Sequence, residues 1–304
     1  MSGLETTITD FLKLTFLSMV PFVLASQGTM LGGRTGVFNV AQEGIMLVGA
    51  SVGFLVSYTT GSNLIGALVA MAAGGLFGLV LAYFTTTLKM DQFVVGLALF
   101  FIGTGLSSLL PKLVIGITLT PPLVKTLPEI PIPLLSQIPI IGPVLFKQNI
   151  LVYFSILLSI FLWYILFRTN MGLRLRSVGE NPKASDALGI NVVSNRYITS
   201  IIGGMLIGLA GAYLPMVYTG TFTDLMTKGR GWIAIALTFF GAWSPLPILI
   251  GSLFFAAIEV LSFRFQVGGS FIPYQFLSML PYIATIIVMI FTFGKSRVPA
   301  FLGQ

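Results

Sequence analysis

Apolar runs, most of them close to 20 residues long, recur along the chain and constrain its fold more than any other feature. A helix needs about 20 apolar residues to cross the hydrocarbon core of a bilayer. The runs lie near Phe11–Leu31, Gln42–Tyr58, Asn63–Thr85, Phe93–Leu110, Asn149–Phe167, Tyr197–Tyr218, Trp232–Phe240, Pro247–Phe263 and Gln275–Phe293. Only Trp232–Phe240 is too short to cross alone. We therefore predict an all-α, polytopic membrane helix bundle with about eight to nine membrane helices, including one half-helix.

The composition agrees with a surface that is mostly covered by a lipid bilayer. Charged residues make up 8% of the chain, against about 25% in a typical soluble domain. The net charge of +7 comes from residues scattered among the apolar runs, so it does not indicate a nucleic-acid surface. The chain has no His and no Cys, which excludes imidazole metal ligands and His-based acid–base catalysis. We expect neither an enzyme nor a nucleic-acid partner.

Two polar connections interrupt what we predict to be a single transmembrane domain, 1–304. The segment 112–148 is rich in proline, and the segment 169–196 is rich in arginine. Loops that are rich in Lys and Arg tend to stay on the cytoplasmic side, so we predict that 169–196 is cytoplasmic and that 112–148 is external. Counting the spans then places the N-terminus outside and the C-terminus, with Lys295 and Arg297, in the cytoplasm. The sequence predicts no role for the external segment.

A proline-containing turn accounts for the short apolar run. Gly241–Pro247 holds Pro245 and Pro247, and proline cannot donate a helical hydrogen bond. We predict a half-helix over Trp232–Phe240, a turn, and a full helix near Pro247–Phe263.

A polar segment, Arg34–Gly44, separates the first two apolar runs; we call it the island. Lipid tolerates such a break only where the backbone is buried in protein or lines a water-filled path. The island is therefore typical of a protein that moves something across the membrane. Asn39, Gln42 and Glu43 would bind a polar solute, or else satisfy the backbone groups of a broken helix. For Glu43 and Arg34 we favour the structural reading, because an intramembrane charge first seeks a partner.

One more carboxylate, Glu259, stands inside an apolar run, five residues before Arg264. It would line a path, or form an ion pair or hydrogen bond that holds two helices; we favour the second reading. The pairs Gly74/Gly78 and Gly204/Gly208 have the small-xxx-small spacing that predicts close helix packing.

A weak internal repeat relates the island to a later segment. Gly36-Val37-Phe38-Asn39 with Gly44 is similar to Gly220-Thr221-Phe222-Thr223 with Gly229, and the predicted topology places the two on opposite sides of the membrane. This pattern predicts an inverted repeat of the kind found in transporters, unless two glycine-rich loops agree by chance.

The arginine-rich segment contains a strong helix signal. Asn181 is a good N-cap, Pro182 suits the first turn and Gly189 suits the position past the end. We predict a helix of about two turns there. From these signals alone, it would merely connect two spans.

Three separated motifs carry a resemblance to a known family. They are Gly172-x-x-x-Arg176-x-Val178-Gly179-Glu180-Asn181-Pro182-x-Ala184 followed by Gly189-Ile190, the island continued through Ile45-Met46 to Gly49-Ala50, and Gly229-Arg230-Gly231-Trp232-Ile233-Ala234 followed by Gly241-Ala242-Trp243-Ser244-Pro245. Together they resemble permease subunits of the ABC importer superfamily, of the branched-chain amino acid / ribose-type family and its simple sugar and nucleoside branch. Phe100 departs from the asparagine that is often found at its position in that family.

The resemblance implies that the helix Pro182–Leu188 docks on a separate ATPase subunit, which alone carries ATP and Mg²⁺; this chain would bind no cofactor. Under this reading, coupling would involve Arg174, Arg176, Gly179, Glu180, Asn181, Pro182, Lys183, Ala184 and Gly189. The translocation path would involve Asn39, Gln42, Glu43, Gly44 and Glu259.

The resemblance also implies a multi-pass protein of the cell membrane. Its other partners would be an extracytoplasmic solute-binding protein and a second permease subunit, more often a different chain than a second copy. The solute would be a sugar or a nucleoside, with a branched-chain amino acid as one alternative. An ion-coupled secondary transporter is the other alternative, but it predicts paired intramembrane acids or a His relay, which this sequence lacks.

Overall fold

The computed structural model describes residues 3–116, 120–133, 135–267, 273–292 and 298–303. The predicted positions Lys295 and Arg297 lie outside the described residues. Within the described residues, seven helices are long and apolar enough to cross a membrane, and two shorter apolar helices accompany them. The predicted membrane helix bundle with a half-helix is confirmed.

The long helices follow the predicted apolar runs closely. The seven are α1 (Gly3–Gly33), α2 (Gln42–Thr60), α3 (Asn63–Ala82), α4 (Gln92–Val114), α6 (Ile150–Arg168), α9 (Val192–Tyr213) and α11 (Pro245–Val267). The last predicted run forms α12 (Tyr274–Thr292), one of the two helices with a shorter apolar stretch. The short helices are α5 (Ile141–Leu145), α7 (Asn170–Glu180), α8 (Pro182–Ala187) and α10 (Arg230–Phe240). Short π-helical segments extend α3 over Tyr83–Thr87 and α9 over Leu214–Thr219.

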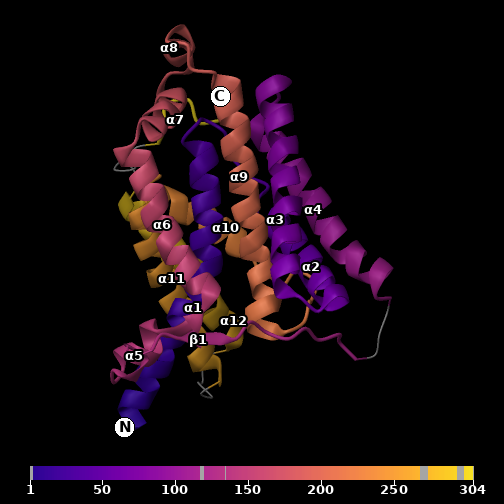
Figure 1. Cartoon of the computed structure of the whole chain (residues 1–304), viewed down its shortest axis with the longest axis vertical. Coiled ribbons are helices and arrows are strands. Elements are labelled where there is room, and N and C mark those ends of the chain that lie inside the picture. Colours follow the sequence, from indigo (N-terminus) through magenta and orange to yellow (C-terminus); the bar gives the residue numbers. More distant parts are fainter. Residues whose placement is uncertain (1–2, 117–119, 134, 268–272, 293–297, 304) are drawn as a thin grey trace.

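The bundle is elongated, with α7, α8 and the C-terminal residues at one end and the N-terminus with α5 at the other (Figure 1). We call these the α8 end and the α5 end. At the α5 end, the proline-rich connection forms a small hairpin that the sequence did not predict. Its strands, β1 (Glu129–Pro131) and β2 (Lys147–Asn149), pair antiparallel, with Ile130 opposite Gln148.

Helix α9 packs at the centre of the bundle, against α1, α2 and α3. A Cβ atom added at Gly204 would overlap the carbonyl oxygen of Gly74, and one added at Gly49 on α2 would overlap the carbonyl oxygen of Gly208. The backbone of α9 is therefore in direct contact with that of α3 at the first crossing and with that of α2 at the second. The close packing predicted from the glycine spacing is confirmed.

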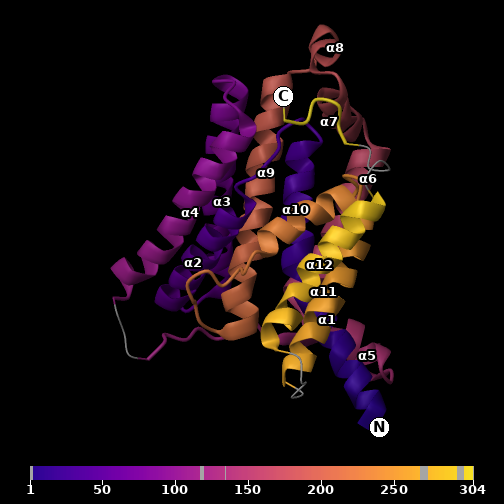
Figure 2. The same cartoon turned by 180° about the vertical axis from the view of Figure 1, so that it is seen from behind.

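On the opposite face of α1, helices α10, α11 and α12 form a second group (Figure 2). The predicted half-helix is confirmed as α10, but Pro245 and Pro247 both fall in the first turn of α11. Proline is tolerated there because the first N–H groups of a helix have no helical partner. The prolines thus start the full helix, two residues earlier than predicted.

The two glycine-rich segments of the predicted repeat lie at opposite ends of α9. The island meets the first turn of α9, where the Arg196 Nε donates to the carbonyl oxygen of Thr35 at 3.0 Å. Gly220 directly follows the π-helical extension of α9, and its carbonyl oxygen accepts from the Val124 N–H at 2.7 Å. The internal symmetry itself stays a prediction.

Candidate functional site

Two consecutive helices, α7 and α8, form an arm at the α8 end (Figure 1); we call it the lever. The side chain of Asn181 accepts from the Ala184 N–H at 3.0 Å, Pro182 opens α8, and Gly189 has a φ of 78°. All three predicted capping features are confirmed. Helix α8 has six residues, slightly fewer than the predicted two turns. Helix α7, which Thr169 caps, was not predicted.

Most of the predicted coupling residues are solvent-exposed on the lever. Pro182 and Arg176 are half-buried, and Gly179 is buried. The exposed residues are Arg174, Glu180, Asn181, Lys183, Ala184 and Gly189. The lever therefore presents cationic side chains and a short, rigid helix to whatever binds this end of the bundle.

Gly179 joins the lever to the island. A Cβ atom at this position would overlap the carbonyl oxygen of Arg34, so only glycine allows the two backbones to touch here. The carbonyl oxygen of Gly179 also accepts from the Phe301 N–H at 3.0 Å, and the Gly303 N–H donates to the Gly36 carbonyl oxygen at 3.2 Å. Phe301 and Gly303 thus connect the lever to the island through backbone hydrogen bonds.

Arg34 extends this connection to the turn between α10 and α11. Its Nε donates to the carbonyl oxygen of Trp243 at 2.7 Å, and a terminal nitrogen lies 3.4 Å from the carbonyl oxygen of Ala242. Both turn residues adopt a positive φ, 48° at Ala242 and 57° at Trp243. Such an angle is costly for residues with a side chain. Trp243 is fully buried in this turn. The guanidinium holds a strained turn in place.

The guanidinium of Arg34 remains charged at neutral pH. Burial and then the nearby Arg176 lower the pKa of Arg34 to about 10, while Glu180 opposes this shift. Arg34 and Arg176 both stack on the ring of Phe167, 5.6 and 5.1 Å from its centroid. One aromatic ring of α6 therefore accommodates a cation from the island and another from the lever.

Within the island, internal contacts engage most of the predicted path residues. The Oδ1 of Asn39 accepts from the Ala41 N–H at 3.0 Å. The Oε1 of Gln42 accepts from the Thr29 hydroxyl, and its Nε2 is buried without a hydrogen-bond partner among the described residues. Gly44 packs on the backbone of Phe100, where a Cβ atom would come within 2.7 Å. Of these residues, Gln42 keeps an unused donor.

Glu43 caps the half-helix α10. One carboxylate oxygen accepts from the Thr227 hydroxyl at 2.6 Å and from the Gly229 N–H at 2.8 Å, and the other accepts from the Gly231 N–H at 2.6 Å. The first N–H groups of a helix lack helical partners and attract negative charge. The carboxylate of α2 thereby fixes the start of α10.

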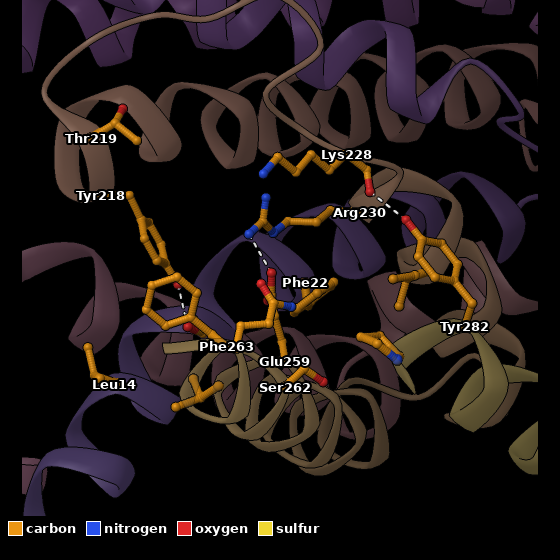
Figure 3. A pocket seen from close by; sticks show the side chains of 15 residues that line it. Leu14, Phe22, Tyr218, Thr219, Lys228, Arg230, Glu259, Ser262, Phe263 and Tyr282 are labelled. Atoms are coloured by element: carbon orange, nitrogen blue, oxygen red, sulfur yellow. Dashed lines mark hydrogen bonds and ion pairs between the residues drawn. The ribbon is translucent and has the colours of Figure 1, made fainter. Parts of the chain in front are cut away.

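Glu259 lies in a second polar cluster, which sequence reasoning found only in part. It forms an ion pair with Arg230 of α10, whereas Arg264 donates to the Thr7 carbonyl oxygen and stacks on Phe11. The pair borders a cavity of about 610 Å³ between α1, α10, α11 and α12 (Figure 3). The sequence analysis identified Glu259 but not its partner Arg230, whose position at the edge of an apolar run was the only signal for it.

The comparison with known proteins identifies the family. Residues 11–292 match the family described as the branched-chain amino acid transport system / permease component. The chain belongs to this family. The predicted resemblance to ABC permease subunits is confirmed, and the chain is a multi-pass membrane protein of a transport family.

Two relatives match nearly the whole chain. The guanosine ABC transporter permease protein NupQ of Bacillus subtilis is 35% identical over 297 residues, which cover 94% of this chain and 92% of NupQ. The nucleoside ABC transporter permease protein NupC of Lactococcus lactis is 36% identical over 300 residues, which cover 92% and 90% of the two chains.

A solved structure of an ABC transporter in an inward-facing conformation shares the fold. Its TM-score is 0.52 at 17% sequence identity, and the match covers 91% of this chain and 84% of that one.

Proposed function

We propose that this chain is the translocation subunit of an ABC importer for a neutral, hydroxyl-rich solute, with a nucleoside as the first candidate and a sugar as the second. The observation that carries the proposal is the lever, a capped and exposed helix pair whose buried Gly179 touches the island. The names of the two relatives support a nucleoside.

The lever would transmit the movement of a separate ATPase subunit. The exposed Arg174 and Lys183 suit acidic groups on that partner, and α8 would be the part that docks. Displacement of α7 would reach the island through Gly179, and Arg34 would pass it to the strained α10–α11 turn. ATP and Mg²⁺ would be held by the ATPase, and no cofactor by this chain.

In this reading the α8 end faces the cytoplasm and the N-terminus lies outside. A solute-binding protein would deliver the solute at the α5 end. A second permease subunit would complete the membrane part of the transporter, as a different chain or a second copy. Asn39, Gln42, Glu43, Gly44 and Glu259 are proposed to lie along or beside the path.

The proposal predicts that a solute-binding protein is encoded beside this chain, and the test starts with that protein. Calorimetry on the purified protein should show binding of guanosine or glucose, and leucine should fail to bind. The complete complex in proteoliposomes should then take up that solute only when ATP is supplied. Uptake that survives without ATP and collapses with the ion gradient would instead establish an ion-coupled carrier.

A further inference from the structure

The cavity beside the Arg230–Glu259 pair has the dimensions and the lining of a small-molecule site. Its volume, about 610 Å³, falls within the range of about 300–1,000 Å³ that is usual for ligand pockets. Phe22, Phe263, Tyr218 and Tyr282 contribute rings to its wall (Figure 3). Most such pockets are apolar with a few convergent polar groups, and this one follows that pattern.

The polar groups of the cavity come from α1, the α9 extension, α10 and the turn before it, α11 and α12. The Tyr218 hydroxyl donates to the Ser18 hydroxyl at 2.5 Å, and the Tyr282 hydroxyl donates to the Lys228 carbonyl oxygen at 2.6 Å. The Arg230 and Glu259 side chains keep 16% and 26% of their surface exposed. An ion pair that only held α10 to α11 would not need an open volume beside it.

Glu259 still has an unused acceptor. One carboxylate oxygen binds Arg230, and the other is buried without a hydrogen-bond partner among the described residues. A buried, unpaired carboxylate oxygen is costly, so a ligand hydroxyl that donates to it after a rotation of the Glu259 side chain toward the cavity would bind favourably. Arg230 balances the charge of Glu259, so this pair by itself does not require an ionised ligand. The Lys228 ammonium also lines the cavity (Figure 3) and offers a further donor to an oxygen of the ligand.

The cavity lies toward the end at which a solute would enter. Its wall includes Leu14 in the N-terminal half of α1 and Thr219 at the end of the α9 extension. The N-terminal half of α1 and the lower end of α9 both lie toward the α5 end, away from the lever (Figure 2). The island runs between the α8 end and the cavity: Gly36 contacts the C-terminal residues at the α8 end, whereas Glu43 binds the backbone N–H groups on either side of Arg230 in the cavity wall.

We propose that this cavity is a solute-binding site on the outer half of the path. It takes a neutral molecule that carries adjacent hydroxyl groups, such as a nucleoside or a sugar. A solute hydroxyl donates to the free oxygen of Glu259, and a ring of the solute packs on the aromatic wall. This inference rests on the proposed function and adds to it a location and a set of contacts.

The chain offers a direct test because it contains no cysteine. A single cysteine is introduced as Ser262→Cys. Ser262 lines the cavity and is 4% exposed, and among the described residues its hydroxyl bonds only to the Ile258 carbonyl oxygen of its own helix. Ser252→Cys on the same helix is the buried control, and Ser194→Cys at the α8 end is the exposed control. A water-soluble thiol reagent is applied to the complete complex during turnover, with guanosine or glucose.

The transported solute should slow labelling of Ser262→Cys at least threefold and leave Ser194→Cys unchanged, while Ser252→Cys should stay unlabelled. If the complex transports one of these solutes but the solute does not slow the labelling of Ser262→Cys, the proposed binding site is wrong, whereas the proposed function still stands. Reaction with a bilayer-soluble reagent only would show that lipid fills the cavity, and would also overturn the proposed binding site. A complex that transports neither solute would overturn the proposed solute class as well.

A second variant tests the contact with Glu259. Glu259→Gln removes the charged acceptor and should raise the KM for the transported solute at least about tenfold, since a hydrogen bond to a charged group is worth that much. An unchanged KM at normal amounts of protein in the membrane would contradict the proposed contact.

Discussion

Replacement of Glu43 by glutamine tests whether this buried carboxylate serves the fold or the solute. Glu43 is 6% exposed and accepts three hydrogen bonds of 2.6 to 2.8 Å, from Thr227, Gly229 and Gly231. Glutamine keeps one acceptor oxygen, so its NH₂ group must face a backbone N–H or a hydroxyl on one side. The variant therefore weakens the charge-assisted bonds and leaves at least one buried donor unsatisfied.

The expected loss follows from these contacts. One unsatisfied buried donor costs about 1–3 kcal/mol, and the loss of charge assistance adds to it, so we expect about 2–4 kcal/mol of destabilisation. At about 2 °C per kcal/mol for a chain of this size, the unfolding midpoint should fall by about 4–8 °C. The detergent-solubilised complex is heated to a series of temperatures, and the fraction that remains folded is measured by size-exclusion chromatography.

The control is Asp224→Asn, which removes an exposed charge 3.5 Å from Lys112 and should change the midpoint little. Gly231→Ala approaches the same contact from the other side, because its Cβ would lie 2.6 Å from Glu43 Oε2, and it should destabilise the protein similarly. A Glu43→Gln variant that unfolds like the wild type but shows a raised KM would refute the capping role and assign Glu43 to the solute.

Three further predictions concern the lever and the central helix. Asn181→Ala removes the cap of α8, at a cost of about 1 kcal/mol, and should lower solute transported per ATP hydrolysed more than Asn191→Ala, which removes the equivalent cap of α9. Gly179→Ala pushes a methyl group into the island; transport should be lost while the protein still reaches the membrane, and normal transport would contradict the proposed connection. Gly204→Ala should lower the unfolding midpoint strongly, whereas Gly105→Ala, with open space around its Cβ position, should leave it unchanged or raise it slightly.

Features that depend on neighbouring residues in the sequence were predictable. The apolar runs gave the long helices, because a bilayer imposes the length of a span. Asn181 and Gly189 marked the ends of α8, because capping is a local interaction. The small-xxx-small spacing within the pairs Gly74/Gly78 and Gly204/Gly208 also predicted close helix packing, although it did not say which helices would meet.

Features that depend on contacts between residues far apart in the sequence were not predictable. Glu43 binds N–H groups almost 190 positions away, and Glu259 pairs with Arg230 on another helix while the nearer Arg264 turns to α1. The hairpin in the proline-rich connection lacks a strong periodic signal. Helix α7 has one, because its buried residues share one helical face, but it lies in a segment that we read as a polar connection. Trp243, which we would place at a membrane interface from its residue type alone, is buried because a tight turn folds it inward against Gly33.

The glycine crossings of α9 have a mechanical consequence. Where two backbones touch, there are no side chains that could change rotamer and let one helix slide past the other. Gly28 of α1 touches Gly203 of α9 in the same way. Helices α1, α2, α3 and α9 should therefore travel as one stiff body during the transport cycle. Relative movement should instead occur at α10. The Glu43 carboxylate holds the start of this helix and the Arg34 guanidinium holds the turn after its end, so a conformational change would have to break and reform these contacts.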